Sequence, residues 1–211
     1  MKIDEEKIRG LRGLHASRKE AIRIRLLEFS RIPSSEYFYE LAYCLMTPQS
    51  SAVHAERVVS LLRAHNFQET GIDPEEFLRG KEHYIRFHKN KSQYLLETRG
   101  KLTEIVSFLS NGCSSVEARD WLAANVKGLG YKEATHFLRN IGRSDGLAIL
   151  DRHILRNLQR YGAIRTIPDS LSKKKYLAIE KQFQQFANVV AIPLDELDLL
   201  FWSMETGEIR K

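Results

Sequence analysis

Residues Asn125–Asp151, NVKGLGYKEATHFLRNIGRSDGLAILD, decide the fold of this chain. Gly128 and Gly130 lie close together between two segments whose apolar residues have helical spacing. Glycine lets the backbone turn sharply and approach a ligand closely, because it has no Cβ atom. The pattern therefore predicts a helix, a tight hairpin and a second helix over about residues 115–141.

Both predicted helices carry boundary signals. Ser114 and Glu117 have the spacing of a capping box, which predicts a helix start. The segment Tyr131–Ile141 places apolar residues on one stripe, and Gly142 follows it as a stop signal. The amides of a hairpin that opens into a helix point outward at the positive end of the helix dipole. The hairpin therefore predicts an anion site, and the natural anion is a nucleic-acid phosphate.

Two residues in this stretch suggest chemistry as well as binding. Lys132 is expected in the first turn of the second helix, where the helix dipole disfavours an ammonium by about 0.3–1 kcal/mol, and a neutral amine is a nucleophile. Asp151 follows the apolar run Leu147–Leu150 and precedes a new helical stripe, which predicts an N-cap. Lys132 could instead contact phosphate, as Lys127 could, and Asp151 could be a plain cap. Their combination with the hairpin favours catalysis.

With these residues the chain resembles the helix-hairpin-helix DNA glycosylases, and more closely the archaeal-type, second subfamily of 8-oxoguanine DNA glycosylase/lyases. The similarity rests on Val126–Lys132, read as VKGLGYK, followed by Ile149–Asp151, read as ILD. The resemblance implies that Lys132 attacks the sugar and that Asp151 assists. The superfamily often has proline where this chain has Lys127, so this position departs from the general pattern.

The resemblance also implies roles for residues outside this stretch. It assigns base recognition to Lys211, Phe87 and Trp202, with the chain-terminal Lys211 distinguishing 8-oxoguanine from guanine. It assigns Gln49 to the hole left by a flipped base, and DNA binding to Gln49, Lys127, Gly128, Gly130 and His136. Taken without the resemblance, Gln49 could be a solvent-exposed turn residue, Phe87 a core residue, and His136 a packed or solvated side chain.

The rest of the chain predicts helices. No ten-residue segment alternates apolar and polar residues, so the predicted fold class is all-α. The resemblance implies two helical lobes, one over residues 34–144 and the other formed by residues 1–33 plus 145–211. Helices are expected over residues 14–31, 37–46, 51–65, 152–161, about 173–190 and 194 to about 204.

Composition favours a polyanionic partner. The chain of 211 residues has 33 Lys and Arg residues against 27 Asp and Glu residues, a formal net charge of +6. From Arg79 to Lys101, basic residues outnumber acidic ones and are interleaved with aromatic residues, a composition suited to phosphates and bases.

Other classes of protein find little support. The two cysteines, Cys44 and Cys113, exclude a four-cysteine iron–sulfur cluster, and the seven histidines form no zinc motif, so neither metal nor cofactor is expected. No window reaches the roughly 18 apolar residues of a membrane span, and the N-terminus lacks the apolar core of a signal peptide. We therefore expect an intracellular protein of the cytoplasm or nucleoid.

The resemblance implies a base-excision DNA repair enzyme. It would be an 8-oxoguanine DNA glycosylase with associated lyase activity at apurinic or apyrimidinic (AP) sites through a lysine Schiff base, acting as a monomer on double-stranded DNA containing 8-oxoguanine. One alternative is a bifunctional glycosylase for oxidised pyrimidines, against which the missing cluster cysteines and Lys211 argue. Another is a non-catalytic helix-hairpin-helix DNA-binding protein, which needs the glycines and basic charge but neither Lys132 nor Asp151.

Overall fold

The computed structural model describes residues 4–209, and over this range the chain forms helices and turns without a strand. The predicted all-α class is confirmed for this part of the chain. The chain divides into two compact units. Ile32–Ile141 forms one unit, called the central unit below, and the segments before and after it form the other, called the terminal unit.

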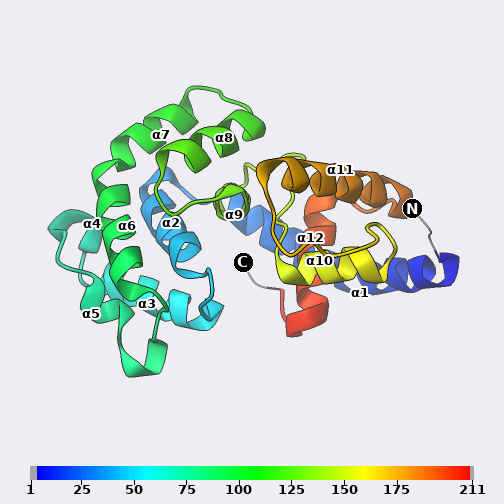
Figure 1. Cartoon of the computed structure of the whole chain (residues 1–211), viewed down its shortest axis with the longest axis horizontal. Coiled ribbons are helices and arrows are strands. Elements are labelled where there is room, and N and C mark those ends of the chain that lie inside the picture. The colour runs from blue at the N-terminus through cyan, green and yellow to red at the C-terminus, as the bar shows by residue number, and fades with distance from the viewer. Residues whose placement is uncertain (1–3, 210–211) are drawn as a thin grey trace. The chain divides into compact units, whose positions relative to one another are not determined.

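The central unit is built around α2 (Tyr37–Met46), which packs against α3 (Ala52–Ala64), α6 (His88–Gly100) and α9 (Tyr131–Asn140) (Figure 1). Every residue of α2 after Tyr37 is buried, as its apolar sequence predicts. The remaining helices of this unit are η1 (Ser34–Glu36), α4 (Phe67–Thr70), α5 (Glu75–Leu78), η2 (Lys81–His83), α7 (Leu102–Ser110) and α8 (Ser115–Asn125).

The terminal unit is arranged around α12 (Leu194–Thr206). This helix packs against α1 (Glu5–Ser30), α10 (Arg152–Arg160) and α11 (Lys173–Val190). Its buried Glu196 ties α1 in place through contacts with two α1 side chains. His15 Nε2 lies 2.5 Å from Glu196 Oε2, and Arg23 Nε donates to Glu196 Oε1 over 2.8 Å. Burial raises the pKa of Glu196, but the hydrogen bonds and charges of Arg23 and His15 outweigh burial and lower it.

Helix α1 starts earlier than the sequence predicts. It begins at Glu5 rather than near residue 14, because Asp4 caps it by accepting hydrogen bonds from the amides of Glu6 and Lys7. Gly10 and Gly13 lie on its exposed side. Glycine weakens a helical pattern, which explains why the first turns were not predicted.

The apolar segment Leu147–Leu150 leads to α10 without joining a sheet. Its backbone bonds to side chains of α11 instead: the Ala148 amide donates to Glu180 Oε1 over 2.9 Å, and the Tyr176 hydroxyl donates to the Ala148 carbonyl over 2.5 Å. The Leu150 amide in turn donates to the Tyr176 hydroxyl over 3.3 Å. These bonds satisfy the buried amide and carbonyl groups of the segment, and they fix the position of Asp151, which follows it.

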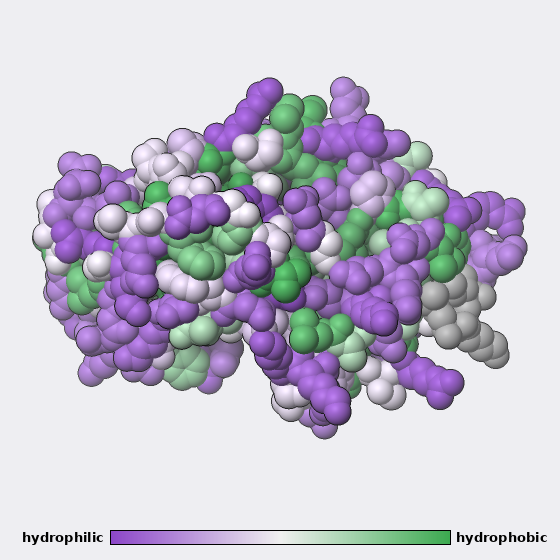
Figure 2. Space-filling view, turned by 90° about the horizontal axis from the view of Figure 1, so that it is seen from above, coloured by the Kyte–Doolittle hydropathy of each residue, from purple (hydrophilic) through white to green (hydrophobic). Residues whose placement is uncertain are grey.

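The face shown in Figure 2 is largely hydrophilic, with separate hydrophobic patches. Among the described residues, no helix is long and apolar enough to cross a membrane. Nor does the same range contain a group of three or more His, Cys, Asp or Glu side chains placed to hold a metal ion. Cys44 is buried and Cys113 half-buried, and the two are not joined by a disulfide.

The role of Tyr176 can be tested by Tyr176→Phe, which removes only the hydroxyl. We expect the free energy of unfolding, measured by urea denaturation, to fall by about 1–3 kcal/mol, because buried backbone groups lose their partner. Tyr84→Phe, at a tyrosine that is 47% exposed, serves as the control and should change stability by less than about 0.5 kcal/mol. Equal effects of the two substitutions would contradict this explanation.

Candidate active site

A hairpin of five residues, Val126–Gly130, joins α8 to α9 as the sequence predicts. The predicted capping box is confirmed, since Ser114 and Glu117 bond reciprocally at the start of α8. Gly128 has φ +92°, and a Cβ atom there would lie 2.4 Å from Tyr94 Cδ2. Glycine is therefore required by the backbone angle and also by the packing.

Lys132 lies in the first turn of α9, where the sequence predicts it. Its side chain is 29% exposed, and its Nζ lies 3.0 Å from Glu133 Oε1. The other carboxylate oxygen of Glu133 accepts a hydrogen bond from the Gly130 amide over 3.2 Å. One carboxylate thus occupies the anion-binding end of the helix and holds the lysine in an ion pair.

Glu133 was not singled out in the sequence, although a signal for it is present. Gly130 and Glu133 have the capping-box spacing, in which the residue at the third helical position bonds back to the amide before the helix. A phosphate could accept a hydrogen bond from the Gly130 amide only if Glu133 gave that amide up.

Lys127 lies within the hairpin and His136 lies one turn after Lys132 in α9, and the two side chains have different environments. Lys127 is exposed and pairs with Glu97 over 2.9 Å; the hydrogen bond and charge of Glu97 raise the pKa of Lys127. His136 is buried, with its ring edge-on to Tyr43 at 5.6 Å between centroids. The exposed side chain of Lys127 can reach a phosphate. The packing of His136 instead favours the alternative that it is a packed side chain.

Gln49 and Phe87 are both exposed and both have left-handed backbone conformations, with φ of +55° and +61°. The alternative that Phe87 is a core residue is wrong, because 47% of it is exposed; the Arg86 guanidinium lies over its ring at 4.9 Å. A left-handed backbone is uncommon for residues with side chains, so the backbone is strained at both positions.

In the terminal unit, Asp151 caps α10 as predicted. Its Oδ1 accepts a hydrogen bond from the Ile154 amide over 2.8 Å. Its Oδ2 accepts one from Trp202 Nε1, also over 2.8 Å. Trp202 thus orients the candidate acid, a contact that sequence analysis missed, because no local pattern links residues on two separate helices.

The described residues hold two partial constellations. The central unit contains Lys132, its hairpin, Gln49 and Phe87, and the terminal unit contains Asp151 and Trp202. Lys211, expected to recognise the base, lies outside the described residues.

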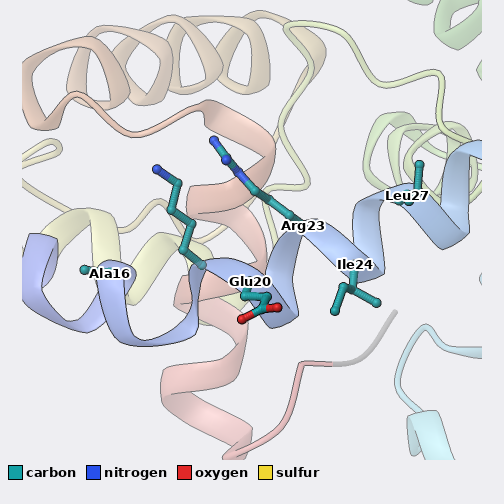
Figure 3. A pocket seen from close by; sticks show the side chains of 6 residues that line it. Ala16, Glu20, Arg23, Ile24 and Leu27 are labelled. Carbon is teal, nitrogen blue, oxygen red and sulfur yellow. The ribbon is translucent and has the colours of Figure 1, made fainter.

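A cavity of about 480 Å³ adjoins α1 in the terminal unit. The labelled side chains in Figure 3 all come from this helix. The lining of the cavity combines charged and apolar side chains, namely Ala16, Lys19, Glu20, Arg23, Ile24 and Leu27. None of these was expected to bind DNA or take part in catalysis.

Known proteins are similar to this chain in sequence and in fold. A family model described as 8-oxoguanine DNA glycosylase matches residues 22–192. The 8-oxoguanine DNA glycosylase/AP lyase of Fusobacterium nucleatum is 41% identical over 198 residues, which cover 89% of this chain and 89% of the relative. The protein of the same name from Korarchaeum cryptofilum is 38% identical over 194 residues, which cover 92% of this chain and 91% of the relative.

The chain belongs to the 8-oxoguanine DNA glycosylase family. A solved structure with the same fold is Methanocaldococcus jannaschii 8-oxoguanine glycosylase/lyase in complex with 15mer DNA containing 8-oxoguanine. It matches with a TM-score of 0.86 at 34% identity, covering 98% of this chain and 100% of that chain. Membership in the glycosylase family confirms the resemblance first indicated by the hairpin.

The requirement for glycine in the glycosylase hairpin can be tested with Gly128→Ala, using Gly112→Ala as a matched control. Gly112 also has a positive φ, +75°, but open space where its Cβ would lie. The control should lose about 1–2 kcal/mol of unfolding free energy from backbone strain alone. Gly128→Ala should lose about 1–3 kcal/mol more, because the new methyl group clashes with Tyr94. If urea denaturation gave equal losses of unfolding free energy for the two variants, packing would not be a reason for glycine at position 128.

Proposed function

We propose that this chain excises 8-oxoguanine from double-stranded DNA and then cleaves the strand at the AP site, with Lys132 as the nucleophile. The observation that carries the proposal is a partly exposed lysine in the first turn of the helix after the hairpin, in a member of this family. A lysine amine can displace a base and remain attached to the sugar, so one residue serves both reactions.

Access to the base requires its extrusion from the duplex, which costs a few kcal/mol of stacking and pairing. The hairpin glycines and Lys127 would hold phosphates, and Gln49 would fill the vacated position in the stack. Phe87, Trp202 and Lys211 would contact the extruded base. His136, packed on Tyr43, would support the DNA-binding surface from within.

The first chemical step is displacement of the base. The ion pair with Glu133 must break and Lys132 must lose a proton, because an ammonium has no lone pair with which to attack. The amine then bonds to C1′ of the sugar while the C1′–N9 bond breaks and its electron pair leaves with the base, which takes up a proton. Asp151, held by Trp202 and the Ile154 amide, would stabilise the positive charge that develops on the sugar.

Strand cleavage follows from the same covalent attachment. The attached nitrogen loses a proton, and its lone pair then forms an imine as the C1′–O4′ bond opens and O4′ takes up a proton. Loss of a proton from C2′ then expels the 3′ phosphate by β-elimination. These steps need no metal or cofactor. The central and terminal units would act as the two lobes of the glycosylase, one supplying Lys132 and the other Asp151.

The partner is double-stranded DNA containing 8-oxoguanine, and we expect a monomer acting in the cytoplasm or nucleoid, where the DNA is. The relatives' names support this substrate over oxidised pyrimidines. Duplexes with 8-oxoguanine, with thymine glycol and without damage test the choice directly. Faster excision of thymine glycol would favour the pyrimidine alternative, and binding without cleavage would favour the non-catalytic one.

The nucleophile is tested by Lys132→Gln with an 8-oxoguanine duplex and borohydride, which reduces an imine to a stable adduct. We expect loss of the adduct and a fall of at least about 100-fold in base excision, because glutamine has no nucleophilic amine. Lys127→Gln is the matched control from the same hairpin. It should weaken binding and lower its salt dependence, yet still give the adduct at saturating DNA.

The variant Asp151→Asn separates the assistance that Asp151 gives to base displacement from the attachment of Lys132 to the sugar. Asparagine also caps helices well but has only one acceptor oxygen, so the hydrogen bond from Trp202 is lost if the cap is kept, and stability should fall by about 1–2 kcal/mol. Excision should slow by about 100-fold while the adduct still forms. An adduct in Lys132→Gln equal to that of the native protein would contradict the assignment of the nucleophile.

A further inference from the structure

Lys91 is a basic residue of α6 whose side chain points inward. It lies in the basic run that the sequence associates with DNA phosphates, yet only 5% of the residue is exposed. Its Nζ donates to the Met46 carbonyl over 2.7 Å, to the Pro48 carbonyl over 2.6 Å and to Ser50 Oγ over 3.3 Å. Three acceptors match the three hydrogens of an ammonium, so this lysine is engaged with the protein itself.

All three acceptors belong to one short segment at the end of α2. The Met46 carbonyl is at the C-terminus of that helix, where a positive charge is favourable. Pro48 and Ser50 lie on either side of Gln49, whose φ is +55°. The buried ammonium therefore binds the backbone carbonyl before a left-handed residue and the side chain of the residue after it.

Ser50 extends this bracing to the second left-handed residue. Its Oγ accepts a hydrogen bond from the Arg86 amide over 2.9 Å, directly before Phe87, whose φ is +61°. The Lys91 amide also donates to the Phe87 carbonyl over 3.0 Å. Lys91 and Ser50 thus connect the segment that carries Gln49 to the segment that carries Phe87.

The charge of Lys91 is consistent with this role. Burial, together with the positive charge of Lys132, lowers the pKa of Lys91 to about 8, while Glu133 acts in the opposite direction. The ammonium therefore predominates at neutral pH. It satisfies carbonyl groups at the turn that only hydrogen-bond donors can satisfy.

We propose that Lys91, with Ser50, is a positioning residue that holds two neighbouring segments in place for base extrusion: that of Gln49, which enters the vacated position in the stack, and that of Phe87, which contacts the extruded base. The inference rests on the proposed function, because base extrusion gives these two exposed side chains their shared task. A side chain that replaces a base in the stack is effective only if its backbone is already in place, since ordering it during the reaction would slow extrusion.

The test compares Lys91→Met with the native chain on two substrates. An 8-oxoguanine duplex requires extrusion, whereas a single-stranded oligonucleotide with an AP site needs only the Lys132 chemistry. We expect single-turnover excision from the duplex to fall by about 10- to 100-fold. β-Elimination on the single strand should change by less than about 3-fold. The fluorescence rise of 2-aminopurine beside the lesion, which reports unstacking, should slow to the same extent as excision.

Arg99→Met is the matched control. Arg99 lies on the same helix and also donates to two carbonyl groups, those of Gln68 and Glu69, at 2.7 Å each. It braces a different turn, so this variant should match the native chain on both substrates. Ser50→Ala is the second test variant: it removes the link to Arg86 without changing a charge, and should slow duplex excision in the same direction as Lys91→Met.

The outcomes separate the inference from the function on which it rests. If the native chain excises 8-oxoguanine and both Lys91→Met and Ser50→Ala keep the native rate on the duplex, the inference is overturned. Equal losses on the two substrates also overturn it, because Lys91 would then act on Lys132 or on folding. Should Lys91→Met fail to fold, Ser50→Ala decides alone. A native chain without activity on the 8-oxoguanine duplex refutes the proposed function itself.

Discussion

Gly128 has no room for a side chain, and the candidate site depends on that constraint. Its left-handed backbone lies directly against Tyr94 and Leu45, and this packing confines the path of the hairpin from α8 to α9. That path fixes the position of Gly130 and the first turn of α9. Lys132 is presented there as a consequence, and Glu133 reaches back to the Gly130 amide. Packing around one glycine therefore determines where Lys132, the proposed nucleophile, lies.

The two other segments of the candidate site, which carry Gln49 and lead to Asp151, are held by hydrogen bonds to side chains rather than by a sheet. Lys91 secures the segment that carries Gln49, and Tyr176 and Glu180 secure the one that leads to Asp151. In a helical protein, the segments between helices have backbone groups without helical partners, and burial makes those groups costly unless side chains satisfy them. The candidate site residues Gln49 and Asp151 lie within or directly after such segments, so their geometry depends on contacts between distant parts of each unit.

The sequence predicts those parts of the structure that have local causes. Helices α2 and α11 have the expected bounds, because breaking residues flank their apolar stripes. The hairpin and the cap at Asp151 were likewise readable from glycine spacing and a following helical stripe. Helices α6 and α7 were both missed, because residues 79–101 were interpreted by their basic and aromatic composition and only Lys101 separates the two helices.

Contacts between residues far apart in sequence could not be predicted. The hydrogen bond from Trp202 to Asp151 joins residues 51 positions apart. Lys91 and Arg99 belong to a run that reads as a basic surface, yet both donate to carbonyl groups of the protein. Composition reveals how many charges a segment has, but tertiary packing decides which of them face solvent.

The most direct test of the account is to locate the borohydride-reduced adduct by mass spectrometry of proteolytic peptides. Native protein would be trapped on an 8-oxoguanine duplex, digested, and the sugar-derived mass assigned to a single residue. The account predicts that the modification lies on Lys132 alone. An adduct on another amine, such as Lys91 or Lys127, would contradict the claim that the hairpin exists to present Lys132 as the nucleophile.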